Sequence, residues 1–507
     1  MVDIINILFN AYTQILVSLL IGGFVAVSIT KIFDIGPSFP RNLSRTLIVV
    51  LLIYVIILII FYPRYSPPIY RMSPFFAYVD GMILMISLAI LISSFIVISS
   101  YPVGSSDISS VSAVSLLGVL GSILISFSID PVAIIVSWAL LSIASYAIIA
   151  LFKDPLSLDA SARYAVVGVV ASQFLLLGLG LLILFNFVVF SGVLSHGFIG
   201  QDVYRLILML SISMLLVALG FKLGSAPFHF WLPDVYGRGS PYAIAGVAGF
   251  IKIGLVGFLL RFAIYGSGLG YISGFSGSGI DPGVFFYTVA LLSVLSMLIG
   301  SITPLTQSSI QRILAFSSIA HIGFIFIGVA VLSIVPPNST AYLFAFAGVL
   351  IHVLAYSISK SSMFVLVGFM RSVYGSSDLS LVSSVSTKPG SLKTSVIIHL
   401  ANLIGVPPLP GFWGKLLLFL SATYSDPRLY LGFIPWLSLL GIVASIFSVF
   451  YYLNIIRAVS IEGGGSGGSR EIRFIDRHDL FYPYIASLIV IALGILAPGI
   501  MVYLRLI

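Results

Sequence analysis

Long apolar runs, separated by short polar connections, occupy most of the 507-residue chain. A helix needs about 20 predominantly apolar residues to cross a bilayer, and a window of about 19 residues finds fourteen runs that are long enough. In chain order they cover roughly 4–30, 46–62, 78–100, 108–128, 131–152, 162–190, 205–232, 241–265, 284–303, 310–335, 340–370, 394–424, 430–459 and 480–504. The pattern predicts an all-α membrane protein with about 14 transmembrane helices and no second domain.

Basic residues in the short connections predict the orientation of the chain. When the connections are assigned alternately to the two sides, one side holds 14 Lys and Arg residues and the other holds 6. By the positive-inside rule the first side is cytoplasmic, so both termini are predicted to lie outside the cytoplasm in a multi-pass protein of the cell (plasma) membrane. No basic segment precedes the first run, so we expect it to be a retained span rather than a cleaved signal peptide.

Prolines interrupt the chain at two apolar runs. Pro227 and Pro233 lie at the end of one run, and Pro407, Pro408 and Pro410 lie inside another. A helix does not tolerate proline in its interior without a kink or a break. Paired interruptions in the two halves of a membrane protein point to inverted repeats with a transport site at the breaks. Unwound backbone at that depth must be buried in protein or line a wet cavity, so we expect water and charge to run there.

Four lysines lie inside the apolar runs, whereas none of the 16 acidic residues does. They are Lys222, Lys252, Lys360 and Lys415. A side chain of about 6 Å cannot carry its ammonium group to the surface from the middle of a slab about 30 Å thick. Burial can lower the pKa of a lysine by several units, so a buried amine can load and release a proton. Because ionisable residues inside a membrane are functional by default, these lysines predict an ion or proton path.

Histidines accompany the lysines. His352, Tyr356 and Lys360 share one helix face, because eight residues advance a helix by about 800°. His321 lies in the preceding apolar run. Two interpretations stay open, a relay that serves Lys360 and a set of hydrogen-bonded core residues. His229, just after the first proline of the earlier interruption, either lines the break or caps the backbone carbonyls that the break frees.

Composition excludes several classes of chemistry. The chain has no cysteine, which excludes disulfides, thiol chemistry, iron–sulfur ligation and cysteine zinc sites. We expect no cofactor and no metal in this chain, and any electron transfer must take place elsewhere. The net charge of +8 reflects topology rather than nucleic-acid binding, because the cations are spread through the connections. The segment 462–479, EGGGSGGSREIRFIDRHD, is expected to be a flexible cytoplasmic loop rather than a ligand site.

Six short motifs occur in order over most of the chain. They are VDGMILM (Val79–Met85), LLSIASYAIIA (Leu140–Ala150), KLGSAPFHFWLPD (Lys222–Asp234), QRILAFSSIAHIGF (Gln311–Phe324), SKSSMFVLVG (Ser359–Gly368) and GVPPLPGFWGK (Gly405–Lys415). Together they resemble the antiporter-like, proton-translocating membrane subunits of respiratory complex I, the NADH-quinone oxidoreductase. That family is shared with membrane-bound hydrogenases and multisubunit Na⁺/H⁺ antiporters.

The resemblance implies fourteen helices that contain two inverted five-helix repeats, each with one discontinuous helix. The implied divisions are helices 1–3 at 1–105, a first repeat at 106–266 broken near 227, a second repeat at 283–460 broken near 408, a flexible cytoplasmic linker at 461–479 and a last helix at 480–507. The family's functional lysines fall on the four buried lysines, and in the family they form a water-connected polar axis. The implied partners are other membrane subunits of the same complex, its peripheral redox subunits and the lipid bilayer.

The chain departs from the family at one important position. The family has a glutamate on helix five that pairs with the lysine of the broken helix seven, within a motif that matches Trp138 to Tyr146. Here that position is Ala139. Without the acid, Lys222 loses a nearby opposite charge that favours its charged form. Either the neutral amine forms more readily, or a carboxylate of a neighbouring subunit takes the acid's place.

These observations lead to one leading hypothesis and two alternatives. The leading hypothesis is a proton-translocating membrane-arm subunit of a complex I-like, redox-driven pump, with no redox chemistry in this chain. Sodium fits less well, because hard cations prefer oxygen ligands and the membrane interior offers amines. The alternatives are a structural or conformational-coupling subunit with a degenerate half channel, which Ala139 favours, and a subunit of a multisubunit cation/proton antiporter. The sequence leaves open which redox complex the chain joins and which electron acceptor that complex uses.

Overall fold

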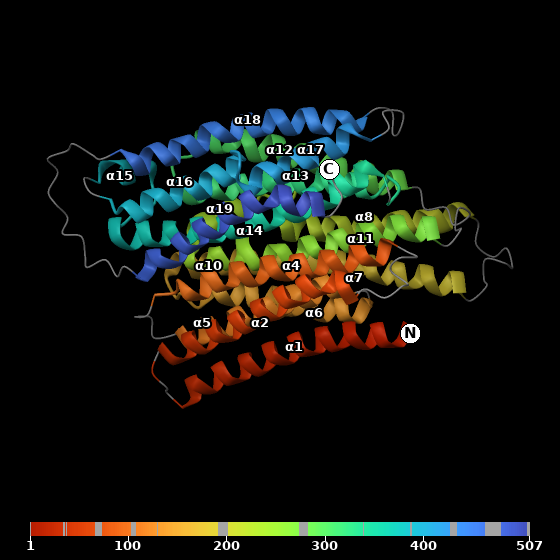
Figure 1. The fold of residues 1–507 in the computed structure, drawn as a ribbon, viewed down its shortest axis with the longest axis horizontal. Helices are drawn as coiled ribbons and strands as arrows, with labels where there is room; N and C mark the ends of the chain where they lie inside the picture. Colours follow the sequence, from red (N-terminus) through yellow and green to blue (C-terminus); the bar gives the residue numbers. More distant parts are fainter. Residues whose placement is uncertain are drawn as a thin grey trace.

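A computed structural model of the chain describes residues 2–33, 36, 38–65, 74–102, 108–128, 130–190, 201–272, 282–337, 339–385, 388–425, 433–461 and 478–503. The long helices of these residues run side by side in one bundle (Figure 1). The first half contains α1 (Val2–Ile32), α2 (Ser38–Tyr65), α4 (Pro74–Ser99), α5 (Ile108–Phe127), α6 (Pro131–Ala150), α7 (Pro155–Phe190), α8 (Gln201–Leu223), α9 (Leu232–Arg238), α10 (Pro241–Gly246), the π-helical turn η1 (Val247–Ile251) and α11 (Lys252–Ile272).

The described residues of the second half are also mainly helical. It contains α12 (Pro282–Ile302), the 3₁₀ turn η2 (Thr303–Thr306), α13 (Ile310–Leu332), α14 (Thr340–Tyr374), α15 (Leu379–Ser384), α16 (Gly390–Ile404), α17 (Pro410–Thr423), α18 (Phe433–Ser460) and α19 (His478–Tyr503). The predicted unit boundaries, 106–266 and 283–460, stay a prediction. Most of the predicted linker, 461–479, lies outside the described residues.

Thirteen described segments are long and apolar enough to cross a membrane. The run expected at 394–424 is not among them, because it is divided between α16, with 15 residues, and α17, with 14. Taken together, these two shorter helices account for one further crossing. The predicted all-α membrane fold, with about 14 crossings and discontinuous helices, is therefore confirmed.

Both breaks begin at a glycine in the left-handed conformation. α8 is followed by Gly224, with φ of 70°, and α16 is followed by Gly405, with φ of 91°. Glycine adopts this conformation without the steric penalty of a Cβ atom, and it ends a helix by turning the backbone off the helix axis. After Gly405, the amide of Val406 still donates to the carbonyl of Ala401 at 3.0 Å, which closes the last turn. Each helix therefore ends because of its own glycine, and the end does not depend on a contact with another helix.

The prolines at the breaks have two roles. Pro227, Pro407 and Pro408 lie in the non-helical segments. Pro233 and Pro410 lie in the first turns of α9 and α17, where a missing amide hydrogen costs nothing because it has no intrahelical acceptor. The last two prolines therefore begin the second segment of each broken helix rather than interrupt the first.

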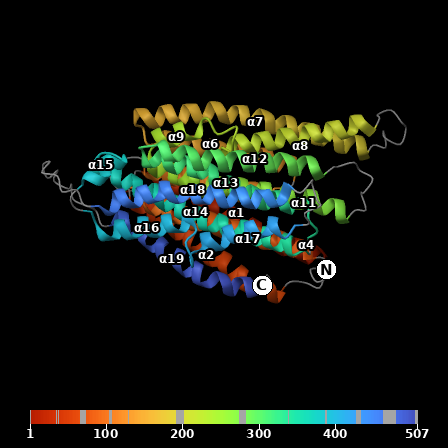
Figure 2. The same cartoon turned by 90° about the horizontal axis from the view of Figure 1, so that it is seen from above.

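The buried centre of the bundle consists of α10, η1, α11, α13 and α14. The residues of Pro241–Ile264 are buried except for the half-buried Phe262, whereas most described residues of α1, α2 and α7 are exposed or half-buried. α1 lies at one edge of the bundle in Figure 1 and α7 at one edge in Figure 2, while α14 packs between α4, α13, α17 and α19. Exposed aliphatic side chains on the outer helices suit contact with lipid. The central helices carry two of the four buried lysines, Lys252 on α11 and Lys360 on α14.

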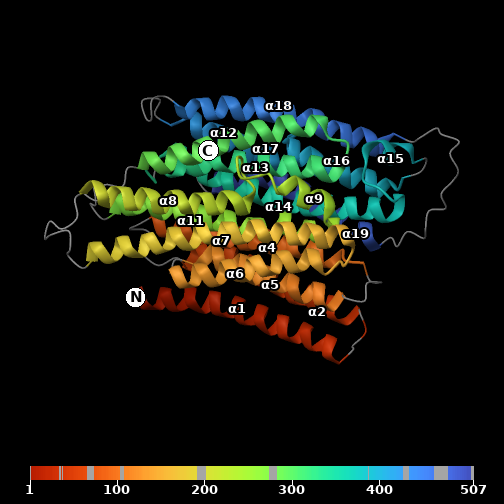
Figure 3. The same ribbon diagram turned by 180° about the vertical axis from the view of Figure 1, so that it is seen from behind.

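The two ends of the chain lie toward the same end of the bundle. The first residues of α1 and the last residues of α19 point away from α15, on the right in Figure 1 and on the left in Figure 3. An even number of crossings produces this arrangement. Which end faces the cytoplasm stays a prediction from the basic residues.

Close packing of glycine against serine fixes the position of α11. A Cβ atom on Gly254 would lie 2.6 Å from the backbone of Ser122 on α5. Only a residue without a side chain allows the two helices to approach so closely. This contact is within one turn of Lys252, so it sets the depth at which that lysine lies in the bundle.

Candidate functional site

Lys222 lies in the last turn of α8, next to the first break, and is 2% exposed. Its Nζ donates a hydrogen bond of 2.9 Å to the hydroxyl of Tyr146 on α6. The same nitrogen lies 4.4 Å from the ring centre of Tyr146, 4.9 Å from that of Tyr164 on α7 and 6.0 Å from that of Trp138. Lys222 is therefore enclosed by aromatic rings from two neighbouring helices.

Ala139, at the position of the expected glutamate, carries no charge. Its side chain is exposed on the outer face of α6, whereas Trp138, the adjacent residue, is 2% exposed and faces inward. The ion pairs that the described residues form join Asp159 and Asp234 to arginines, and none of them includes any of the four buried lysines. Within the described part of the chain, no carboxylate replaces the glutamate that the sequence comparison expected near Lys222.

Lys252 is the most isolated of the four amines. It follows the π-helical turn η1 directly, it is 2% exposed, and its Nζ has no hydrogen-bond partner among the described residues. The nearest aromatic ring, that of Tyr236 on α9, lies 5.6 Å from the nitrogen, and the hydroxyl of Tyr236 likewise has no partner there. Buried polar atoms without a protein partner are rare, and they concentrate where water or protons move.

Lys360, at the middle of α14, is fully buried. Its Nζ donates to the carbonyl of Leu314 on α13 at 2.9 Å and to the hydroxyl of Ser317. It also lies 5.9 Å from the ring centre of Tyr452 on α18. Lys360 therefore points into the interface between α13, α14 and α18.

At this same interface, Lys360 lies near His321, His352 and Tyr356. Nδ1 of His321 lies 3.1 Å from Nε2 of His352, and Nε2 of His321 lies 3.1 Å from the hydroxyl of Tyr452. The ring of Tyr356 lies 5.4 Å from the ring of His321. The predicted shared face of His352, Tyr356 and Lys360 is thus present, and it packs on the helix that carries His321. Tyr452 is a member that the sequence analysis missed.

Lys415 lies in the first helical turns after the second break. Its Nζ donates to the carbonyls of Leu403 and Ile404, at 3.0 and 2.9 Å, and lies 4.9 Å from the ring centre of Phe324. These carbonyls belong to the last residues of α16, where backbone oxygens lack intrahelical donors and the helix dipole is negative. Lys415 therefore contacts the end of the other segment of its own broken helix.

Asn402 holds the second break together, and sequence reasoning did not identify it. Its Oδ1 accepts a hydrogen bond of 2.8 Å from the amide of Gly411, across the break. Its Nδ2 donates to the carbonyl of Ala355 at 3.0 Å and to the hydroxyl of Ser359 at 2.7 Å, both on α14. A polar residue inside an apolar run was the available signal, but its partners depend on which helices are neighbours.

His399, one turn before Asn402, is a second residue that sequence reasoning did not identify. It is fully buried, with Nδ1 3.3 Å from the hydroxyl of Ser359 and Nε2 3.1 Å from the carbonyl of Pro483 on α19. A neutral ring that accepts from Ser359 and donates to Pro483 satisfies both nitrogens. His399 therefore joins α14 to α19 as a hydrogen-bonded core residue.

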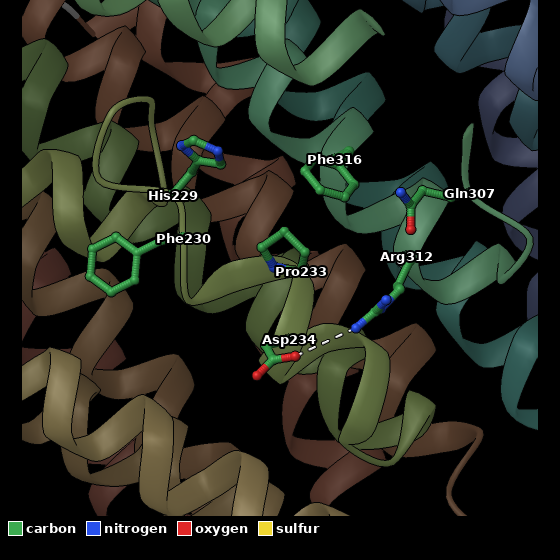
Figure 4. Close-up of a pocket in the computed structure, with 7 residues that line it drawn as sticks. All are labelled: His229, Phe230, Pro233, Asp234, Gln307, Arg312 and Phe316. Carbon is green, nitrogen blue, oxygen red and sulfur yellow. Dashed lines mark hydrogen bonds and ion pairs between the residues drawn. The ribbon is translucent and has the colours of Figure 1, made fainter. Parts of the chain in front are cut away.

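His229 lines a pocket of about 250 Å³ beside the first break. The pocket is lined by His229, Phe230, Pro233, Asp234, Gln307, Arg312 and Phe316 (Figure 4). Its mouth carries the contact between Arg312 on α13 and Asp234 on α9, at 3.5 Å. His229 therefore lies at the pocket beside the break, and its two interpretations, lining the break or capping freed backbone carbonyls, both stay predictions.

An ion-pair cluster surrounds this pocket and joins three helices. Asp234 also contacts Arg163 on α7 at 3.1 Å and Arg238 at 3.6 Å, and Asp159 contacts Arg163 at 3.0 Å and Arg238 at 2.6 Å. Exposed ion pairs contribute little to stability, so the cluster positions α7, α9 and α13 more than it stabilises them. α9 and α15 lie toward the same end of the bundle (Figure 2).

The elements that carry the four lysines pack against one another in sequence. α8 packs against α11, α11 against α13, and α13 against α14 and α17. Among the described residues, no group of three or more His, Cys, Asp or Glu side chains has the arrangement of a metal site. The arrangement is therefore a series of amines, imidazoles and phenols through the buried centre, with a helix break at each end.

Comparison with known proteins identifies relatives of this chain. It is 30% identical over 363 residues to NADH-quinone oxidoreductase subunit N 2 of Chloroherpeton thalassium, which covers 70% of this chain and 66% of that protein. It is 29% identical over 355 residues to NAD(P)H-quinone oxidoreductase subunit 2 of a Nostoc species, which covers 69% of this chain and 63% of that protein. The matches thus span slightly less than two thirds of these relatives' length.

Solved structures share the fold over nearly the whole chain. A chain of respiratory complex I from Thermus thermophilus with bound aureothin superposes with a TM-score of 0.72 at 23% identity, covering 96% of this chain and 98% of that one. A chain of the membrane-bound sulfane sulfur reductase, an archaeal respiratory membrane complex, gives 0.74 at 19% identity, covering 96% and 95%. A chain of the Mrp complex from a Dietzia species gives 0.72 at 17% identity, covering 97% and 96%.

A protein-family model also matches this chain. The model described as "NADH:quinone oxidoreductase/Mrp antiporter, TM" matches residues 128–441, which include both helix breaks and all four buried lysines. Because this match covers more than half of the chain, it establishes the family independently of the weaker structural identities. The chain is an antiporter-like membrane protein that belongs to the NADH:quinone oxidoreductase/Mrp antiporter transmembrane family.

Proposed function

We propose that this chain is a proton-translocating membrane-arm subunit of a complex I-like, redox-driven proton pump. The observation that carries the proposal is the set of four buried lysines, each without an acidic partner in the described residues, spaced through the centre of the bundle between two helix breaks. A buried amine without a counter-charge is costly, and such residues are retained in membranes where ions or protons pass. The related subunits of respiratory complexes support the same assignment.

In the proposed path, the two breaks serve as the places where protons enter and leave the buried centre. Lys222, beside the first break, and Lys415, beside the second, are the end groups, and Lys252 and Lys360 lie between them. The pocket lined by His229 supports an entry from the bundle end that carries the ion-pair cluster. The chain of contacts from His352 through His321 to Tyr452 supports a relay next to Lys360, since each member has a nitrogen or oxygen that can give and accept a proton.

The proton is the proposed ion, and sodium is disfavoured. A sodium ion needs several oxygen ligands, usually including carboxylates. The contacts of the four lysines supply two serine or tyrosine hydroxyls and three backbone carbonyls, and no carboxylate. Each contact suits an amine that donates hydrogen bonds.

The free energy for pumping must come from partner subunits. The chain has no cysteine to bind an iron–sulfur cluster, and we expect no cofactor in it. We propose that it assembles with other membrane subunits and with peripheral redox subunits, in the cell membrane, with both termini outside the cytoplasm. The solved structures that share this fold support the proposal, because they are chains of a respiratory complex I and of an archaeal respiratory membrane complex.

One alternative is favoured by a specific observation. Lys222 has no carboxylate partner among the described residues, and Ala139 faces outward, so the first half channel can be degenerate and the chain can serve for structural or conformational coupling. A subunit of a cation/proton antiporter, as the likeness to the Mrp complex suggests, is the other alternative. A preparation of the intact complex that contains redox subunits distinguishes the pump from the antiporter.

The test is coupled proton uptake by the purified complex in vesicles. Lys252→Met removes the amine that has no protein partner, so we expect the complex to assemble while its proton flux per electron falls by about tenfold or more. Lys153→Met, in an exposed connection, is the matched control and is expected to pump normally. Full pumping by the Lys252→Met complex removes this lysine from the path, and a flux that depends on sodium contradicts the assignment of the ion.

A further inference from the structure

Lys222 is surrounded by aromatic rings to a degree that no other buried lysine reaches in the described residues. Three ring centres lie within 6.0 Å of its Nζ, and the closest, that of Tyr146, is at 4.4 Å. Lys252 and Lys415 each have one such ring and Lys360 has two, at 5.9 and 6.0 Å, whereas Lys222 has two rings closer than 5 Å besides that of Trp138 at 6.0 Å. Lys222, which has the most rings around it, is also the lysine for which the family motif predicts an acidic partner. This chain has Ala139 in place of that acid.

The three rings are braced by their own contacts. Tyr146 and Tyr164 meet edge to face, with centres 4.9 Å apart at 87°, and Tyr164 stacks on Trp231 at 4.5 Å and 14°. The indole nitrogen of Trp138 donates to the hydroxyl of Ser172 at 2.9 Å. These contacts hold the rings in place around the amine, so the enclosure does not depend on Lys222 alone.

Small residues on the surrounding helices make room for this enclosure. A Cβ atom on Gly168 would lie 1.6 Å from the hydroxyl of Tyr146, so α7 can only carry glycine there. The hydroxyl is thereby kept within 2.9 Å of the lysine nitrogen. α6 and α7 thus place three groups around Nζ of Lys222. They are the hydroxyl of Tyr146 and the rings of Trp138 and Tyr164.

We propose that Trp138, Tyr146 and Tyr164 form an aromatic cage that serves as the counter-group of Lys222, in place of a carboxylate. The negative face of an aromatic ring attracts a cation, and the attraction is strongest where water is excluded. The tyrosine hydroxyl accepts a hydrogen bond from the same charged amine. The cage stabilises the proton-loaded lysine without adding a negative charge, so the three rings are positioning residues. This inference rests on the proposed function, in which Lys222 takes up a proton.

The first experiment measures the interaction itself, without proton flux. It is a double-mutant cycle of Lys222→Met and Tyr164→Leu, read as the thermal unfolding midpoint of this chain in the purified complex. We expect Tyr164→Leu to lower the midpoint clearly more when Lys222 is present than when it is methionine. Tyr451→Leu, which removes a buried tyrosine from the second half, is the control and is expected to show no such dependence on Lys222.

The second experiment measures function with conservative and disruptive variants of one ring. Tyr164→Phe keeps the ring face and is expected to pump within about twofold of the unaltered complex. Tyr164→Leu removes the face and is expected to lose about fivefold or more of the proton flux. A simple packing role would instead make the loss follow side-chain volume, with no recovery from a new charge.

A new carboxylate near Lys222 tests whether a negative charge can replace the ring of Tyr164. Ser142 lies four residues from both Trp138 and Tyr146 on α6, so its side chain shares their face. Adding Ser142→Asp to Tyr164→Leu is expected to restore flux at least in part, because a carboxylate again faces the amine, whereas the equally sized Ser142→Asn is expected to restore none.

The outcomes separate this inference from the proposed function. An absent thermal coupling between Lys222 and Tyr164, or equal flux in the Asp and Asn variants, overturns the cage whether or not the complex pumps. Thermal coupling together with full pumping by Lys222→Met leaves the cage in place and removes Lys222 from the proton path instead.

Discussion

At the scale of single residues, the breaks depend on a few polar side chains that replace missing helix contacts. Asn402 supplies three hydrogen bonds at the second break, to Gly411 across the gap and to Ala355 and Ser359 on α14. Lys415 then covers the free carbonyls of Leu403 and Ile404. Because each of these groups is buried, losing one partner leaves the other unsatisfied, at about 1–3 kcal/mol for each group.

The Asn402 network predicts a stability effect. Asn402→Leu leaves the amide of Gly411 without its partner and removes a second hydrogen bond from the carbonyl of Ala355, so we expect a loss of about 1–3 kcal/mol in this chain's stability. Thermal unfolding of the purified complex measures it. Ser395→Ala, on the same helix at a buried hydroxyl without a partner among the described residues, is the control and should change little. Equal effects of the two substitutions would show that Asn402 does not hold the break.

At the scale of helices, local sequence predicted the breaks and tertiary neighbours decided what fills them. Gly224 and Gly405 end α8 and α16 through their own backbone conformation, so proline and glycine spacing was enough to place the breaks. The roles of Tyr452 and Asn402 could not be predicted, because each depends on which helices pack together. The family resemblance put Ala139 at the position of the expected glutamate, but it could not show that the rings of Trp138 and Tyr146 on the same helix lie around Lys222.

Helix spacing gives the next prediction. Gly254→Ala places a methyl group 2.6 Å from the backbone of Ser122, so α11 must move away from α5, and we expect a loss of about 1–3 kcal/mol and reduced proton flux. Gly180→Ala, on α7 where a Cβ atom meets nothing within 4 Å, is the matched control and should preserve or slightly raise stability. Unchanged stability and flux in the Gly254→Ala complex would mean that this close contact does not position Lys252.

At the scale of the whole molecule, two broken helices and a series of buried amines occur in one bundle, and the buried side chains of the described residues include no Asp or Glu. The helices at the periphery expose aliphatic side chains, while α10, α11, α13 and α14 enclose the polar groups. Lys222 and Lys415 lie beside the two breaks, and the pocket lined by His229 adjoins the first break. Which face is cytoplasmic is a separate prediction from the basic connections.

Orientation can be measured directly, because the chain has no cysteine of its own. Leu381→Cys on α15 and Tyr424→Cys at the end of α17 each create one exposed thiol at opposite ends of the bundle. We expect a membrane-impermeant maleimide to label the first only from the cytoplasmic side and the second only from the outside. The unaltered chain, which has no thiol, is the control for specificity. The reverse labelling pattern would invert the predicted topology.

The central claim is that the buried lysines carry protons, and Lys415 allows it to be tested against a purely structural role. Lys415→Arg keeps a positive charge and donors for the carbonyls of Leu403 and Ile404, but a guanidinium does not release its proton in a protein. The measurement is the number of protons moved per electron pair by the intact complex in vesicles. The account predicts an assembled complex whose number falls as far with Lys415→Arg as with Lys415→Met, and an undiminished number with Lys415→Arg would contradict it.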